Sequence, residues 1–156
     1  MLKYPYKKNT FFRKNSGKKR AKPMPKRQFR RICKALKSHG VVVWIGDAAD
    51  NICKSQNAEA FTLNENTVVF RRNPSRSVVY EELIHLYQFA SGKCDGTKIS
   101  RIKCEIEAKE KVLRCAASYK LTRLDIDITK KALQQDYKDL QDYYKGGGYH
   151  DYTGCN

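Results

Sequence analysis

A short apolar stretch that carries four polar side chains constrains this chain more than any other feature. Residues 78–89 have the sequence VVYEELIHLYQF, and at about 100° per residue a helix here brings Glu81, His85 and Gln88 into a narrow arc. The other faces are almost entirely apolar, which is typical of a helix buried in a core. A buried carboxylate or imidazole is costly without a partner, so this stripe must be paired, bound to a metal or used in chemistry.

A second helix is predicted over residues 98–119, and it also turns one carboxylate inward. Its angular pattern places Glu105 between Ile102 and Val112, near the middle of the apolar face. Glu107 falls on the opposite, charged side, where we expect it to be solvated. Glu105 can therefore meet the polar stripe of residues 78–89.

The remaining pattern predicts an α+β fold, in which a small three-stranded sheet is packed by about four helices. Thr122 and Asp125 resemble a capping box that opens the last helix. Residues 46–57 are predicted to form a polar loop, and the β-branched run at 41–45 is typical of a strand buried on both faces. We expect strands at 41–45, 60–63 and 67–71, the last two forming a hairpin, and helices near 28–38, 76–91, 98–119 and 122–144.

Charge divides the chain into unequal parts. The net charge is +16, and the first acidic residue is Asp47, so the 15 Lys and Arg of residues 1–46 are unbalanced by any acid. Residues 1–27 show no periodic apolar face, which predicts a basic, disordered leader that the fold does not need. We expect an α+β domain over 28–145 and a flexible Gly/Tyr tail over 146–156.

The basic leader admits two interpretations. Residues 1–31 could contact nucleic acid or an anionic surface, with the candidate contacts Lys18, Lys19, Arg20, Arg30 and Arg31. Alternatively, they form a solubilising segment that joins this chain to a larger precursor. The sequence leaves both open.

The sequence disfavours a membrane-spanning protein and a zinc-knuckle protein. The sequence has neither a run of about 18 apolar residues nor the apolar core of a signal peptide, so we expect a soluble protein that is cytoplasmic or delivered into a target cell, with no membrane span. The six cysteines include no C-x-x-C pair, which argues against a zinc knuckle. Cys104 and Cys115 are predicted to be small core residues, and a disulfide would instead involve Cys94 or Cys155.

The spacing E-E-x-x-H places Glu81 and His85 one turn apart, the geometry that H-E-x-x-H uses to hold a metal beside a general base. With Glu105 on the next helix, this resembles the zincin metallopeptidases that take a glutamate as third ligand. The phrase E-E-L-I-H-x-x-Q is similar to zincin-like domains at the C-terminus of bacterial polymorphic toxins and phage minor head proteins. The resemblance covers roughly residues 28–119.

The resemblance implies a metal-dependent hydrolase, possibly a toxin or effector domain, with a role for each residue of the motif. Glu81, His85 and Glu105 would ligate the metal, Glu82 would act as general base or acid, and Gln88 would support the site. Zinc is the implied cofactor, although two oxygen ligands also suit manganese or iron. A protein or peptide substrate and a cognate immunity protein are the implied partners.

Three other interpretations compete with this one. The polar residues could form a self-satisfied buried cluster, balanced by Lys109 or Arg76. The chain could be a nucleic-acid-binding protein that works through its leader. It could also be a metal-independent RNase-type toxin that uses Glu82 and His85 as acid and base.

Overall fold

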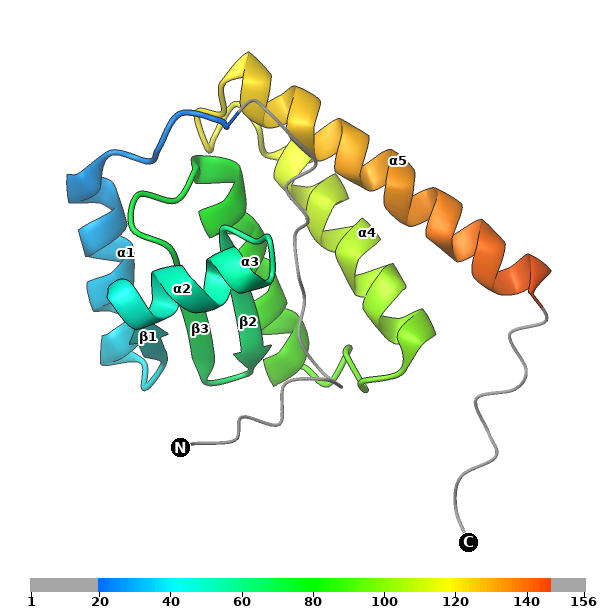
Figure 1. Cartoon of the computed structure of the whole chain (residues 1–156), viewed down its shortest axis with the longest axis horizontal. Helices are drawn as coiled ribbons and strands as arrows, with labels where there is room; N and C mark the ends of the chain where they lie inside the picture. The colour runs from blue at the N-terminus through cyan, green and yellow to red at the C-terminus, as the bar shows by residue number, and fades with distance from the viewer. Residues whose placement is uncertain (1–19, 147–156) are drawn as a thin grey trace, which may run out of the picture.

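The computed structural model describes residues 20–146, which form five helices and one three-stranded sheet (Figure 1). The predicted α+β class with a small sheet is confirmed, with one helix more than expected. The elements are α1 (Lys26–Ser38), β1 (Val42–Trp44), α2 (Asp47–Ser55), β2 (Ala60–Asn64), β3 (Thr67–Phe70), α3 (Arg76–Ala90), α4 (Lys98–Arg114) and α5 (Arg123–Lys145).

The sheet has the strand order β1-β3-β2. Strands β2 and β3 form the predicted antiparallel hairpin, with Ala60 opposite Phe70, and the Asn66 amide donates to the Asn64 side chain in its turn. Strand β1 pairs with β3 in parallel. Because it has a neighbour on one side only, β1 is an edge strand, and Val42 is 49% exposed. The expectation that this strand is buried on both faces was therefore wrong.

Helices cover both faces of the sheet. Val68 and Phe70 of β3 pack with α1 and α3 on one face, while Val69 packs with Ala49 and Cys53 of α2 on the other. This alternation follows from the two-residue period of a strand. Helix α3 is apolar nearly all round because it also contacts α4, where Ile84 meets Ala108 and Val112. The stripe of polar residues on α3 is consequently held between the sheet and α4.

Helix α2 occupies most of the segment that the sequence predicted as a polar loop. Its two buried residues, Ala49 and Cys53, are one turn apart, which gives the short helix a narrow apolar stripe. Asp47 and Asp50 in its first turn form ion pairs with Arg72 after β3. The loop prediction was wrong because this stripe is too narrow to stand out from its polar neighbours.

The other helices differ from expectation mainly at their ends. Helix α4 is capped by Thr97 and ends at Arg114, not near 119, because the chain turns over residues 115–120. The predicted capping box of α5 is confirmed, since the Thr122 side chain accepts from the Asp125 amide and the Asp125 side chain accepts from the Thr122 amide.

The packed body includes residues before 28, where the sequence placed its start. Ala21 and Met24 are buried, and the Met24 amide donates to the Pro74 carbonyl at 2.8 Å. Arg20 forms an ion pair with Glu59. Residues 1–19 and 147–156 lie outside the described part, so the predictions for most of the leader, including Lys18 and Lys19, and for the tail stay predictions.

The described cysteines are not all unpaired core residues, and their disulfide involves Cys94, which the sequence indicated as a candidate. Cys104 is buried as predicted but forms a disulfide with Cys94 of the preceding loop, while Cys115 is free and only half-buried. The prediction that both are simple core residues was therefore wrong. Over residues 20–146, none of the helices has the length and apolar character needed to cross a membrane.

Candidate metal centre

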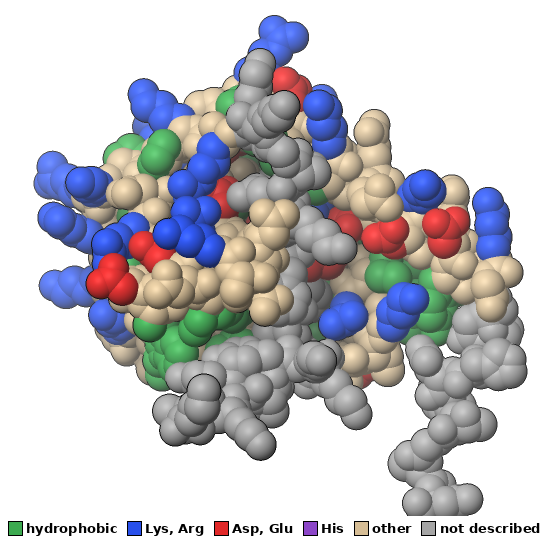
Figure 2. Space-filling view, in the orientation of Figure 1, with side chains coloured by type: hydrophobic (Ala, Val, Ile, Leu, Met, Phe, Trp, Pro, Cys, Tyr) green, Lys and Arg blue, Asp and Glu red, His purple; other side chains and the backbone are tan. Residues whose placement is uncertain are grey.

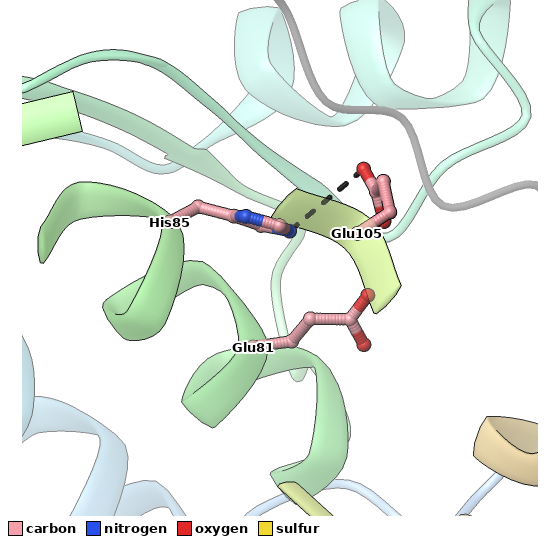
Figure 3. A group of neighbouring side chains, drawn as sticks. All are labelled: Glu81, His85 and Glu105. Atoms are coloured by element: carbon pink, nitrogen blue, oxygen red, sulfur yellow. Dashed lines mark ion pairs between the residues drawn. The ribbon is translucent and has the colours of Figure 1, made fainter. Parts of the chain in front are cut away.

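Three residues predicted as metal ligands converge between α3 and α4. Glu81 and His85 lie one turn apart on α3, and Glu105 faces them from α4 (Figure 3). Each offers one ligand atom, and the three atoms lie within 4.8 Å of one another. Glu81 and His85 are 1% exposed, and the side chain of Glu105 is 14% exposed. The inward direction predicted for Glu105 is therefore the one observed.

Gln88 fixes the orientation of the His85 ring. Its amide nitrogen donates to the Cys104 carbonyl at 3.0 Å and to Glu107 Oε2 at 3.1 Å, so its oxygen is the atom that faces His85 Nδ1 at 2.8 Å. The proton must therefore lie on Nδ1. In a neutral ring of this tautomer, Nε2 is the nitrogen that can bind a metal, and it lies 3.8 Å from Glu105 Oε1. This is the tautomer and the supporting hydrogen bond that metal-binding histidines use.

Glu82 is buried beside the three converging residues and has its own support from the sheet. The Thr62 hydroxyl of β2 donates to Glu82 Oε2 at 2.8 Å. Burial raises the pKa of Glu82 well above its usual value, and the negative charge of Glu81 raises it further, although the Thr62 hydrogen bond opposes the shift. A carboxyl group with a raised pKa accepts a proton more readily than an ordinary glutamate does.

Lys109 supplies positive charge to the same region. Its ammonium is 3.2 Å from Glu81 Oε1, contacts Glu105 Oε2, and lies 2.8 Å from Asp136 Oδ2 on α5. Burial acts to lower the pKa of Lys109, but the three carboxylates together raise it above its ordinary value, so the ammonium stays charged. Burial raises the pKa of Asp136 to about 6, although Lys109 opposes this.

The sequence predicted a role for Lys109 but not for Asp136. Lys109 was foreseen only as a balancing charge for a self-satisfied cluster, and it does contact two of the carboxylates. Asp136 was missed. The available signal was its position three residues after Leu133 and four before Leu140, which places it on the inner stripe of α5. Arg76, the other balancing charge proposed, has no ion pair among those found for the described residues.

The donor set fits a divalent metal. Two carboxylates and an imidazole would provide three ligands and leave a position for water, the arrangement of catalytic metal sites. Glu105 directs one oxygen to Lys109 and the other toward His85 Nε2, so its contact with the ammonium leaves an oxygen on the ligand side. Glu107, expected to be solvated, is only half-exposed and also reaches Gln88.

The described residues that were predicted as candidate nucleic-acid contacts lie outside the candidate metal centre. Arg20 pairs with the buried Glu59, while Arg30 and Arg31 are exposed on α1. Lys and Arg side chains gather at the α1 side of the molecule (Figure 2). Helix α1 itself contains six basic residues and no acidic one, and these bases are Lys26, Arg27, Arg30, Arg31, Lys34 and Lys37.

A small α+β domain in which candidate metal ligands join a helix of the E-E-x-x-H type to the next helix is typical of the metallopeptidase-type class. Comparison with protein families identifies it more closely, because the model of the family described as metallopeptidase toxin 4 matches residues 12–138. The chain belongs to this family. No curated protein and no solved structure gives a significant match.

Proposed function

We propose that this chain is a metal-dependent peptidase domain of a toxin, in which Glu81, His85 and Glu105 hold one divalent cation. The observation that carries the proposal is the convergence of these three residues with His85 Nε2 turned toward Glu105. Membership of the metallopeptidase toxin family supports the class of reaction. Zinc is the cation we propose, with manganese and iron as alternatives because two of the three ligands are hard oxygens.

Each side chain of the proposed centre has its own role in the hydrolysis. A bound divalent cation would polarise the peptide carbonyl and lower the pKa of a water molecule. Glu82 takes a proton from the attacking water as the C–O bond forms, and it passes this proton to the leaving amine as the C–N bond breaks. Gln88 holds His85 in the ligating tautomer, and Thr62 holds the Glu82 carboxyl group.

We also propose the partners that this activity requires. The substrate would be a protein or peptide, and the producing cell would need an immunity protein against a toxic peptidase. The basic face of α1 is the surface we propose for an anionic partner, because its six bases carry charge that α1 itself does not balance. A metal-independent RNase is less consistent with this geometry, since His85 is directed toward Glu105 and Glu82 toward Thr62.

The test compares Glu82→Gln with His85→Ala. Protein purified without added metal is analysed for its metal content, and its melting temperature is followed in chelator and in Zn²⁺, Mn²⁺ or Fe²⁺. Cleavage of a fluorescein-labelled unfolded protein reports activity. Glu82→Gln should keep metal-dependent stabilisation and lose activity by about 10²–10⁴-fold. His85→Ala should lose both.

Glu65→Gln, an exposed change in the hairpin turn, is the matched control and should behave as wild type. A wild-type protein that contains no metal and gains no stability from any of the three cations would refute the metal centre. The buried, self-satisfied cluster would then explain these residues.

A further inference from the structure

The Lys109 ammonium lies among carboxylates from three different helices. Glu81 reaches it from α3, Glu105 from α4 and Asp136 from α5, and Lys109 itself is 3% exposed. Lysine is rarely buried to this extent unless it is paired. Unlike a surface ion pair, this contact joins a buried cation to two candidate metal ligands.

The charges explain why a cation is needed before any metal arrives. Glu81 and Glu105 bring carboxylate oxygens into one buried site, where like charges repel and hydration is lost. Ionised Glu81, Glu105 and Asp136 carry −3 together, and Lys109 reduces this to −2. The ammonium therefore offsets part of the charge that a divalent cation would neutralise.

The same contacts orient the ligands. The ammonium contacts Glu105 Oε2, while the other oxygen, Oε1, is the one directed at His85. Glu81 also meets the ammonium through one oxygen, Oε1. Asp136 in turn anchors the ammonium from α5, a helix that contributes no candidate ligand. Lys109 and Glu105 are one turn apart on α4, so the helix fixes their separation.

We infer that Lys109, anchored by Asp136, is an internal counter-cation that neutralises and positions the ligand carboxylates Glu81 and Glu105 before the metal binds. This inference rests on the proposed metal centre. Lys109 is thus a positioning residue. It also makes α5 part of the site, since Asp136 draws positive charge away from the two ligands and toward itself.

Two substitutions should move zinc affinity in opposite directions. Lys109→Met keeps the length of the side chain and removes its charge, so the metal-free protein should melt well below wild type. It should also bind Zn²⁺ about tenfold more tightly, because removing the competing positive charge from a buried site should outweigh the loss of ligand orientation. Asp136→Asn leaves the ammonium to the ligand carboxylates alone and should weaken Zn²⁺ binding about tenfold.

The experiment measures Zn²⁺ binding by calorimetry and melting temperatures in chelator and in saturating Zn²⁺. The controls are Lys111→Met on α4 and Asp139→Asn on α5, both exposed, and both should match wild type. The gap in melting temperature between wild type and Lys109→Met should narrow with Zn²⁺. A Lys109→Met protein that folds only with Zn²⁺ is the extreme form of the same result.

If Lys109 only stabilises the fold, the difference in melting temperature between wild type and Lys109→Met would be the same with and without Zn²⁺. Neither variant would then change zinc affinity. This result would overturn the inference but leave the proposed metal centre intact. If Lys109→Met does not fold under either condition, Asp136→Asn decides, and equality with Asp139→Asn overturns the inference. A wild type that does not respond to any metal overturns the proposed function and this inference together.

Discussion

Helix α3 carries two buried polar clusters, and their compositions differ. The cap cluster at its start consists of Ser75 and Ser77 with Glu59, Asp125 and Arg20. The ligand cluster in its middle consists of Glu81, Glu82, His85 and Gln88, with Glu105, Lys109 and Asp136 from α4 and α5. Both clusters are buried against the same helix, so burial alone does not separate them.

The cap cluster matches donors to acceptors. Asp125 accepts from the Thr122 amide, the Thr122 hydroxyl and the Ser77 hydroxyl, and Glu59 accepts from Arg20 and Ser75. The ligand cluster instead brings four carboxyl groups to one ammonium and the Thr62 hydroxyl. A cluster with balanced donors stabilises the fold, whereas an excess of acceptors around one point indicates a place for a cation.

Within the cap cluster, the largest effect on stability is expected from Asp125→Ala. Asp125 is fully buried and accepts three hydrogen bonds, so its loss leaves buried donors without their acceptor and removes the α5 capping box. The free energy of unfolding should fall by about 3 kcal/mol. Urea unfolding with and without Zn²⁺ measures it.

Zinc should not change that loss, because the cap cluster is separate from the metal centre. Asp127→Ala, an exposed change in the same helical region, is the control and should cost well under 1 kcal/mol. A loss that Zn²⁺ partly reverses would instead show that the two clusters are coupled through α3.

A smaller effect, which depends on pH, is expected in the ligand cluster. Glu82 has a pKa raised by burial in the folded state, so above its ordinary pKa of 4.5 the folded protein binds more protons than the unfolded chain. Stability from this group is complete below pH 4.5 and is lost as pH rises to the folded-state pKa. The loss is about 1.4 kcal/mol per pH unit in that window.

Glu82→Gln removes this titration and keeps an acceptor for Thr62. In chelator, the difference in unfolding free energy between wild type and variant should therefore fall as the pH rises above 4.5, while Glu65→Gln should run parallel to wild type. Parallel curves for wild type and Glu82→Gln would mean that Glu82 is not held in a protonated state.

Sequence patterns predicted those parts of the fold and site that depend on local geometry. The hairpin follows from strand alternation, the start of α5 from Thr122 and Asp125, and the convergence of Glu81, His85 and Glu105 from angular positions on two helices. Each of these rests on spacings within one element or between neighbours.

The features that were missed depend on contacts between distant segments. Nothing local assigns β1 to the edge of the sheet, since that depends on how β2 and β3 pair. The Cys94–Cys104 disulfide depends on how the loop before α4 folds back. Asp136 meets Lys109 only because α5 packs along α4, and the length of the connection between those helices does not fix which residues face each other.

The smallest effect is expected from Glu107→Gln, at the border of the ligand cluster. Glu107 accepts from Gln88 at 3.1 Å and from Lys93 at 2.6 Å, and the Lys93 hydrogen bond lowers its pKa. A glutamine can still accept from Gln88, and the lost ion pair is half-exposed. The cost should stay below about 0.5 kcal/mol, with zinc affinity changed by less than about threefold.

Gln88→Leu should lower zinc affinity much more than Glu107→Gln does. It removes the acceptor of His85 Nδ1, so zinc affinity should fall about 10–100-fold, as is usual when the group that orients a ligating histidine is lost. Calorimetry on both variants measures the ratio. If Glu107→Gln weakens zinc as strongly as Gln88→Leu, the Glu107 carboxylate is part of the chain of hydrogen bonds that orients His85. The ligand cluster would then extend to the molecular surface, unlike the cap cluster.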